Sequence, residues 1–189
     1  DLSRNLTDEQ LQLMLRTEYG GINETLADVY SITGQNKYLN LANRYTDQSL
    51  LHPLLQHQDK LTGLHANTQI PKIVGVARIA ALSHNKAWLE SADYFWQQVV
   101  HQRSVSIGGN SVREHFHQAD DFRPMLEDVE GPETCNTYNL LKLTRHLFTW
   151  QPNSELTNYY ERALYNHILA SQNPESGMMC YFVPLRMGT

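Results

Sequence analysis

Apolar residues recur every three to four positions over most of this chain, which is the spacing of one buried face of an α-helix. The first run follows the tetrapeptide TDEQ at residues 7–10, which has the form of a capping box, and ends near Gly20. Further runs predict helices over residues 23–33, 37–49, 69–82, 86–101, 134–149 and 154–171. The run MMCYFVPL, at residues 178–185, leaves a short strand open. The pattern as a whole predicts an all-α fold.

Three of the predicted helices share one short pattern, an aromatic residue four positions before an alanine. The pairs are Tyr38 and Ala42, Trp88 and Ala92, and Tyr159 and Ala163, each a few residues after a predicted turn. An alanine at that position lets two helices approach closely, so the pattern indicates three successive helix hairpins of similar build. We therefore expect residues 1–189 to be a single, partial (α/α)6 toroid domain that is truncated at its C-terminal side. A complete, open helical bundle is the alternative.

Residues 108–139 interrupt the helical pattern. They read GGNSVREHFHQADDFRPMLEDVEGPETCNTYN and hold the densest run of acidic side chains in the chain. Loops on a rigid helical scaffold are where binding and catalytic residues usually lie. This segment is therefore the first candidate for a functional site.

Glu114, in this segment, has two interpretations. Ser111 and Glu114 have the spacing of a capping box, in which the glutamate has only a structural role. Alternatively, Glu114 is a general acid/base whose protonation is tuned by neighbours such as Arg113. The residues alone leave both interpretations open. The nearby His115 and His117 are more typical of surface or packing residues than of metal ligands.

The same segment ends with a proline followed by an acidic residue and a cysteine. Because proline suits the first position of a helix, Glu133 and Cys135 are expected in a helix's first turn. Glu133 there can simply complement the helix dipole, and Cys135 can be a small buried residue. The functional alternative is a metal site, because a cysteine near a helix N-terminus loses its proton more readily and thiolate binds zinc. Two ligands do not complete a zinc site, and no CxxC or HExxH motif supplies the others.

Polar residues open two other predicted helices. The motif HANTQ at residues 65–69 precedes one of them, and Asn23 and Glu24 occupy the same place one repeat earlier. Asn67 or Thr68 can simply cap its helix. Alternatively, both helix starts lie on one rim and bind sugar hydroxyls, because histidine, asparagine and glutamine side chains donate or accept hydrogen bonds.

Composition narrows the function classes. The chain has 189 residues, of which 41% are hydrophobic, and a net charge of −5, which argues against nucleic acid as its main partner. No apolar run approaches the roughly 20 residues that span a bilayer, so no membrane segment is expected. The polar start DLSRNLTDEQ does not resemble a signal peptide. The two cysteines, Cys135 and Cys180, leave a disulfide, a metal ligand and a buried thiol open.

Five segments, in order, resemble glycoside hydrolase family 127 and its sister family 146, the β-L-arabinofuranosidases. They are EYGGINETLADVYSITGQNKYLNLA, GLHANTQIPKIVGVAR, GGNSVREHF, EGPETCNTYNLLKLT and YYERALYNHILASQ, and they cover nearly the whole chain. The resemblance implies an (α/α)6 toroid catalytic domain followed by β-rich domains, and retaining hydrolysis of arabinofuranosides. It also implies zinc as the cofactor, a plant-type arabinose-containing oligosaccharide as the substrate, and export to the periplasm or the exterior.

The resemblance also implies roles for individual residues. Glu114 matches the family's acid/base, and Glu133 and Cys135 match the zinc ligands of its ETC motif. His65 matches a position on the sugar-binding rim, and Glu24 is assigned to the same rim.

The family's remaining zinc ligands, including the cysteine nucleophile, come from an adjacent cysteine pair farther along the chain. This sequence has no such pair, and Cys180 lies in a stretch that precedes it in the family. We therefore expect the nucleophile to lie beyond residues 1–189 and this segment by itself to be inactive.

Two rival hypotheses remain. One is a zinc-independent α/α-toroid sugar hydrolase or lyase, which a chelator distinguishes from a zinc enzyme. The other is a noncatalytic carbohydrate-binding or scaffold segment. In each case an open ring exposes the apolar faces of its end helices, so self-association is expected.

Overall fold

The computed structural model describes residues 2–17 and 19–188. Helices make up most of this part of the chain, and none of them is long and apolar enough to cross a membrane. The α-helices are α1 (Asp8–Met14), α2 (Ile22–Thr33), α3 (Asn36–Arg44), α4 (Gln48–Leu55), α5 (Ala66–Ser83), α6 (Lys86–Gln102), α7 (Arg123–Glu127), α8 (Thr134–Trp150) and α9 (Ser154–Ala163). A 3-10 helix, η1 (Leu2–Asn5), precedes them, and a π-helical turn, η2 (Leu164–Leu169), follows α9. The prediction of an all-α fold is confirmed.

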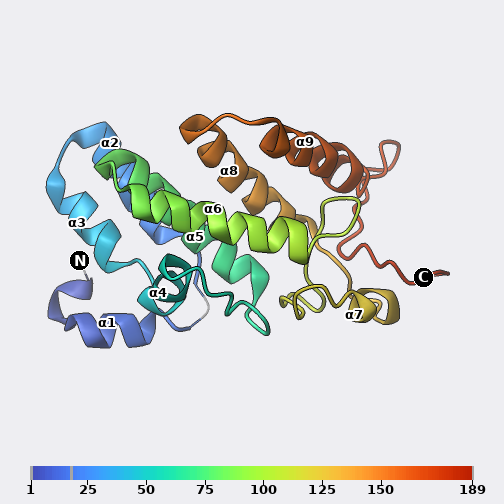
Figure 1. Cartoon of the computed structure of the whole chain (residues 1–189), viewed down its shortest axis with the longest axis horizontal. Coiled ribbons are helices and arrows are strands. Elements are labelled where there is room, and N and C mark those ends of the chain that lie inside the picture. The colour runs from blue at the N-terminus through green and yellow to red at the C-terminus, as the bar shows by residue number, and fades with distance from the viewer. Residues whose placement is uncertain (1, 18, 189) are drawn as a thin grey trace.

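Three helix hairpins form the body of the molecule (Figure 1). α2 packs on α3, α5 packs on α6, and α8 packs on α9, while α5 also packs against both α2 and α8. The first helices of the hairpins therefore lie side by side in the order α2, α5, α8. The short helices α1, α4 and α7 lie along one edge of this arrangement (Figure 1).

The alanines of the repeated pattern belong to the second helix of each hairpin. Ala42, Ala92 and Ala163 are all fully buried. Ala163 also lies against Gly108, where an added Cβ would come within 2.6 Å of the Ala163 Cβ. α5 is apolar on nearly all sides because it lies between its neighbours, with Ile70, Ile73 and other side chains in the main core. The prediction of three similar hairpins is confirmed.

The predicted helix ends are confirmed in two places. Thr7 and Gln10 form the capping box, with the Gln10 N–H donating to Thr7 Oγ1 at 3.2 Å and the Thr7 N–H donating to Gln10 Oε1 at 2.9 Å. α2 ends at Gly34, which adopts a left-handed conformation with φ of 67°. Glycine is the usual residue at such a position because it has no Cβ.

The helix predicted over residues 37–49 is wrong at its end. α3 stops at Arg44, and a separate helix, α4, begins after Asp47, whose carboxylate accepts a hydrogen bond from the Ser49 N–H at 3.0 Å. Pro53, a residue type that usually ends or kinks a helix, lies inside α4. α4 forms nevertheless because its leucines, Leu50, Leu51 and Leu54, are buried in the core. Tertiary burial here outweighs the local effect of proline.

The C-terminal region also departs from the prediction. The helix predicted to reach residue 171 changes to π-helical geometry at Leu164. The apolar run at 178–185 contains no strand in the part of the chain that the structure describes, and it forms only isolated antiparallel bridges. One bridge pairs Phe182 with Glu133, and another pairs Met179 with Gln172. The segment therefore folds back across the start of α8.

Candidate functional site

Glu114 lies in a tight turn rather than a helix. Val112 and His115 form an antiparallel bridge, and Ser111, Arg113 and Glu114 all have positive φ, at 79°, 47° and 66°. The capping-box interpretation of Ser111 and Glu114 is therefore wrong, because the next helix begins only at Arg123. Positive φ is rare for residues other than glycine and is held in place only by a well-determined environment.

Backbone hydrogen bonds fix this turn on two sides. The Ala66 N–H donates to the Glu114 carbonyl at 2.8 Å, which ties the turn to the start of α5. The Arg113 N–H donates to the Glu130 carbonyl at 2.8 Å, which ties it to the segment before α8. The turn therefore presents the Glu114 side chain between the first turns of two core helices.

His65 lies beside Glu114. Its Nε2 is 3.6 Å from Glu114 Oε2, and its ring meets the ring of His115 edge to face at a centroid distance of 5.1 Å. His65 is the N-cap residue of α5, so the interpretation of Asn67 or Thr68 as the cap is wrong. The structure brings His65 and Glu114 together, although they lie far apart in the sequence.

Glu133 and Cys135 lie at the start of α8. Glu133 is the N-cap residue rather than part of the first turn, whereas Cys135 lies in that turn as predicted. The Glu133 side chain makes no capping hydrogen bond, is 1% exposed, and has a buried Oε2 without a hydrogen-bond partner among the described residues. A buried carboxylate oxygen without a partner is unusual and calls for a ligand or another explanation.

Burial and neighbouring charges shift the pKa values of Glu133 and Cys135. Burial raises the pKa of the Glu133 carboxyl; a hydrogen bond from Tyr181 lowers it in part, and the charge of Glu114 adds to the rise. Burial also raises the pKa of the Cys135 thiol, and the charge of Glu133 raises it further. Without a cation, this site therefore disfavours negative charge, as expected where two anionic ligands converge.

Tyr181 is a site residue that the sequence analysis missed. Its hydroxyl donates to Glu114 Oε1 at 3.2 Å, and its interaction with Glu133 raises the pKa of the tyrosine to about 12. The segment reaches the site because the Val183 N–H donates to the Pro132 carbonyl at 2.9 Å. No local spacing singles out this tyrosine. The adjacent Cys180 is exposed, and its Sγ lies 2.8 Å from the Phe182 carbonyl oxygen.

The donor set at Glu133 and Cys135 suits zinc, which binds thiolate and carboxylate ligands. Among the residues that the structure describes, no group of three or more histidine, cysteine, aspartate or glutamate side chains is placed to hold a metal ion. A structural or catalytic zinc takes more than two protein ligands. Glu133 and Cys135 therefore fit as two ligands of a site that needs further donors.

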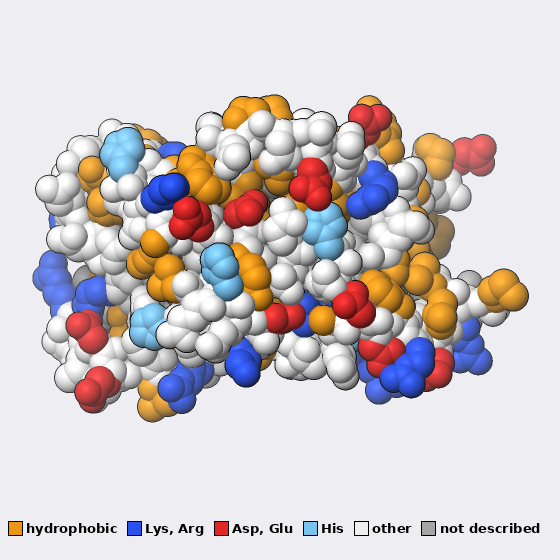
Figure 2. Space-filling model, in the orientation of Figure 1, with side chains coloured by type: hydrophobic (Ala, Val, Ile, Leu, Met, Phe, Trp, Pro, Cys, Tyr) orange, Lys and Arg blue, Asp and Glu red, His pale blue; other side chains and the backbone are white. Residues whose placement is uncertain are grey.

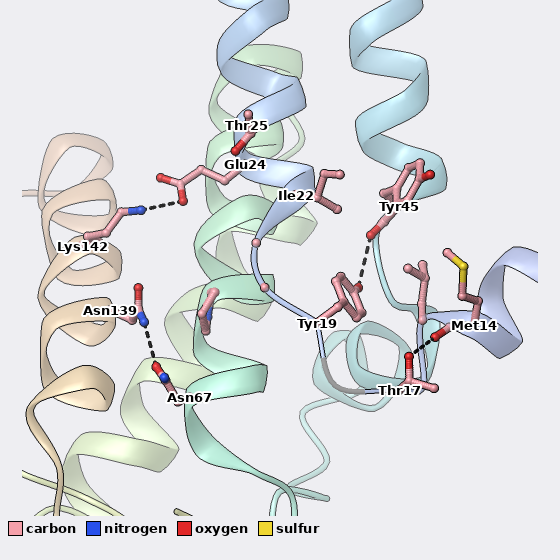
Figure 3. A pocket seen from close by; sticks show the side chains of 14 residues that line it. Met14, Thr17, Tyr19, Ile22, Glu24, Thr25, Tyr45, Asn67, Asn139 and Lys142 are labelled. Atoms are coloured by element: carbon pink, nitrogen blue, oxygen red, sulfur yellow. Dashed lines mark hydrogen bonds and ion pairs between the residues drawn. The ribbon is translucent and has the colours of Figure 1, made fainter. Parts of the chain in front are cut away.

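Glu24 lies in a neighbouring cleft of about 960 Å³ between α2, α5 and α8 (Figure 3). In this view Glu24 comes from α2, Asn67 from α5, and Asn139 and Lys142 from α8. Glu24 Oε2 is 2.7 Å from Lys142 Nζ, and the Asn139 side-chain amide donates to Asn67 Oδ1 at 2.9 Å. The two helix starts therefore share one cleft, as the sequence analysis expects for a common rim.

The ion pair with Lys142 favours the ionised form of the Glu24 carboxyl. Burial alone would raise the pKa of its carboxyl, but hydrogen bonds from His146 and Lys142 outweigh burial and hold the pKa below its usual value. Glu24 is thus a paired carboxylate in the cleft, separate from the group formed by Glu114 and Glu133. Asn139 lies one helical turn after Cys135, so the cleft adjoins that group along α8.

Two other polar residues of the sequence analysis have packing roles. His117 is buried, and its ring nitrogens lie 2.7 Å from the Gln118 carbonyl and 3.2 Å from the Arg103 carbonyl. Asn23 is buried and donates to the Lys72 carbonyl at 2.9 Å.

Acidic and basic side chains are interspersed on the face shown in Figure 2.

Comparisons with known proteins agree with this architecture. Residues 1–189 match the family model described as "Beta-L-arabinofuranosidase, GH127 catalytic domain". No curated protein matches the chain. Several solved structures are similar in fold, among them three glycoside hydrolases.

The first, a GH127 β-arabinofuranosidase, is 22% identical with a TM-score of 0.73, and the match covers 94% of this chain and 31% of that one. The second, a GH127 β-L-arabinofuranosidase from Geobacillus stearothermophilus T6, is 18% identical with a TM-score of 0.69, covering 87% and 30%. The third, described as a glycoside hydrolase, is 16% identical with a TM-score of 0.70, covering 96% and 36%.

The chain thus spans about a third of the length of these structures. At this level of identity the likenesses show the fold, and they agree with the predicted placement of the three hairpins in an α/α toroid. Structural similarity at this identity does not assign the family. The family model does, because it matches the chain from the first residue to the last. The chain belongs to glycoside hydrolase family 127, as part of its catalytic domain.

Proposed function

We propose that the complete protein is a retaining glycoside hydrolase that releases β-L-arabinofuranose, with Glu114 as the acid/base. The observation that supports this best is the meeting of Glu114, Glu133 and Cys135 at the starts of α5 and α8. Tyr181 interacts with both carboxyl groups. A retaining glycosidase needs an acid/base on one side of the scissile bond and a nucleophile on the other, and this arrangement supplies the first of these.

The surroundings of Glu114 suit proton transfer. Its side chain is 39% exposed, so a glycosidic oxygen can reach it from the solvent side. In the first step Glu114 protonates the leaving oxygen, and in the second it accepts a proton from the attacking water. Tyr181 and His65 lie on its two oxygens and orient the carboxyl group between these steps. We assign His65, in addition, to contact with the sugar.

Glu133 and Cys135 would hold zinc, together with further ligands outside residues 1–189. Zinc, when bound, supplies the positive charge that keeps thiolates deprotonated near neutral pH. The unpartnered Glu133 Oε2 and the raised pKa values of both groups support this assignment. A bound cation would give that oxygen a partner and would stabilise the charged form of both groups. The nucleophile is then one of the further cysteine ligands.

The cleft beside this group would take more of the glycan. Its amides, Asn67 and Asn139, and its ion pair, Glu24 and Lys142, offer hydrogen bonds of the kind that sugar hydroxyls need. We infer a plant-type arabinose-containing oligosaccharide as the substrate and a periplasmic or extracellular location. Both inferences rest on the family resemblance.

Glu114→Gln in the complete protein tests the proposal. Loss of a general acid/base lowers turnover by about 10²- to 10⁴-fold, so hydrolysis of an alkyl β-L-arabinofuranoside, whose leaving group needs protonation, should fall by that amount while elemental analysis finds zinc unchanged. Glu130→Gln is the matched control, because Glu130 is an exposed carboxylate of the same segment. Full turnover in Glu114→Gln would contradict the assigned role.

Two further outcomes address the rival functions. Full activity after removal of zinc by a chelator would favour a zinc-independent toroid hydrolase or lyase. Arabinoside binding in calorimetry without any turnover by the complete protein would favour a noncatalytic binding segment.

A further inference from the structure

A buried hydrogen bond lies directly under the turn that carries Glu114. The Asn136 side-chain amide donates to Ser111 Oγ at 2.7 Å, and both residues have no exposed surface. Ser111 is three residues before Glu114, at the start of the stretch with positive φ. Because both side chains are fully buried, the surrounding packing fixes the geometry of this bond.

Asn136 belongs to the first turn of α8, next to Cys135. It therefore connects the turn of the acid/base to the helix start that carries Glu133 and Cys135. The neighbouring Thr137 contacts His167 of η2, with Thr137 Oγ1 and His167 Nδ1 at 2.8 Å. Successive residues of this helix turn thus bond to different neighbours: Thr137 contacts η2, and Asn136 bonds to the Glu114 turn at Ser111.

The Glu114 turn depends on such a support. Residues 111, 113 and 114 are not glycines, yet all have positive φ, a conformation that persists only when the surroundings fix it. The backbone bonds to Glu130 and Ala66 hold the turn at residues 113 and 114. At residue 111 the support is the side-chain bond from Asn136.

We propose that Asn136 is a positioning residue that sets Glu114 against the Glu133–Cys135 pair through its hydrogen bond to Ser111. This inference rests on the proposed function of Glu114 as acid/base. It goes beyond that function because Asn136 has no exposed surface and bonds to the turn rather than to Glu114 itself. Asn136 sets the position of the Glu114 carboxyl at the moment when the glycosidic bond breaks. Small displacements of a catalytic group lower rates steeply.

The test uses the complete protein and two arabinosides with different leaving groups. A nitrophenyl β-L-arabinofuranoside has a leaving group that needs little protonation, whereas an alkyl β-L-arabinofuranoside depends on the acid. Asn136→Ala and Ser111→Ala should each lower kcat/KM for the alkyl substrate by about 10- to 100-fold, the usual effect of losing an outer-shell partner. For the nitrophenyl substrate the loss should be at least threefold smaller, with zinc content unchanged.

The double variant and a control make the result specific. Ser111→Ala with Asn136→Ala should be no slower than either single variant, because both remove one bond. The matched control is Thr144→Val, which removes another buried side-chain bond of α8, from Trp96 Nε1 to Thr144 Oγ1 at 2.8 Å. It should lower thermal stability without a leaving-group-dependent loss.

Three results would overturn the inference. They are equal losses on both substrates, additive losses in the double variant, and a leaving-group-dependent loss in Thr144→Val. If the unaltered complete protein hydrolyses neither substrate, the proposed function itself fails, and the inference fails with it. If the unaltered protein hydrolyses both substrates, the proposed function stands, and any of the three results above then counts against the role of Asn136 alone.

Discussion

Lys72 and Asp47 form an ion pair that is almost fully buried at both ends. The Lys72 Nζ is 2.8 Å from Asp47 Oδ2, and the two side chains are 3% and 4% exposed. Lys72 Nζ also donates to the Leu15 carbonyl at 3.2 Å and lies 4.3 Å from the centre of the Tyr19 ring. Leu15 and Tyr19 line the cleft that holds Glu24, so this ion pair fixes one wall of the cleft.

We predict that Lys72→Met strongly destabilises the catalytic domain. The substitution leaves the Asp47 carboxylate buried without a cation, which typically costs about 3–5 kcal/mol. Each kcal/mol lowers Tm by about 2–4 °C in a unit of about 150–250 residues and by less in a larger one, so the Tm of the complete catalytic domain should fall by several degrees, up to roughly 20 °C. Differential scanning calorimetry of the complete protein measures it on the transition of the catalytic domain.

Two companion variants test the reasoning. Lys72→Met with Asp47→Asn should recover at least half of the loss, because no charge is then buried and the asparagine can still accept from Ser49. Lys142→Met is the matched control, since its side chain is 36% exposed and its pair with Glu24 is partly hydrated. That variant should cost at most about 1 kcal/mol. A Lys72→Met loss as small as the control's, or no recovery in the double variant, would refute the argument.

Three further predictions concern the site. Cys135→Ser should lower the zinc content of the complete protein, and unchanged zinc by elemental analysis would remove Cys135 from the ligand set. Tyr181→Phe should lower kcat/KM about tenfold, equivalent to about 1.4 kcal/mol, because Tyr181 is 58% exposed and water replaces part of its bond to Glu114. A rate equal to that of the unaltered protein would exclude the bond from catalysis. Burial lowers the pKa of His167 from 6.5 to about 4, so the stability that depends on its neutral form is complete above pH 6.5 and is lost as pH falls towards 4. His167→Gln should flatten the dependence of Tm on pH across this range, and an unchanged slope would contradict the assignment.

Local sequence patterns were sufficient for the hairpins. The long helices α2, α5, α6 and α8 follow the predicted runs within a few residues, because apolar spacing directly encodes which face of a helix is buried. The repeated alanine pattern also marked buried positions, since Ala42, Ala92 and Ala163 are all fully buried. Motif resemblance supplied Glu114, Glu133, Cys135 and His65 as candidates, and the structure brings these four together.

Other features depended on tertiary structure. α4 forms around Pro53 because its leucines complete the core, which no local preference for residues 48–55 indicates. The positive φ angles at Arg113 and Glu114 are held by hydrogen bonds to other segments, because the Arg113 N–H donates to the Glu130 carbonyl and the Glu114 carbonyl accepts from the Ala66 N–H. A capping box was one of the two interpretations that the local sequence left open.

The site itself consists of contacts between distant parts of the chain. Tyr181 is 67 residues from Glu114, Asn139 is 72 residues from Asn67, and Lys142 is 118 residues from Glu24. Such pairs depend on how the three hairpins stack and on where the C-terminal segment crosses α8. Periodicity carries no information on either, because it records burial relative to a single helix axis. The sequence by itself therefore determined the long helices and most of the candidate residues, and only the packing of the hairpins and of the C-terminal segment decided which side chains meet.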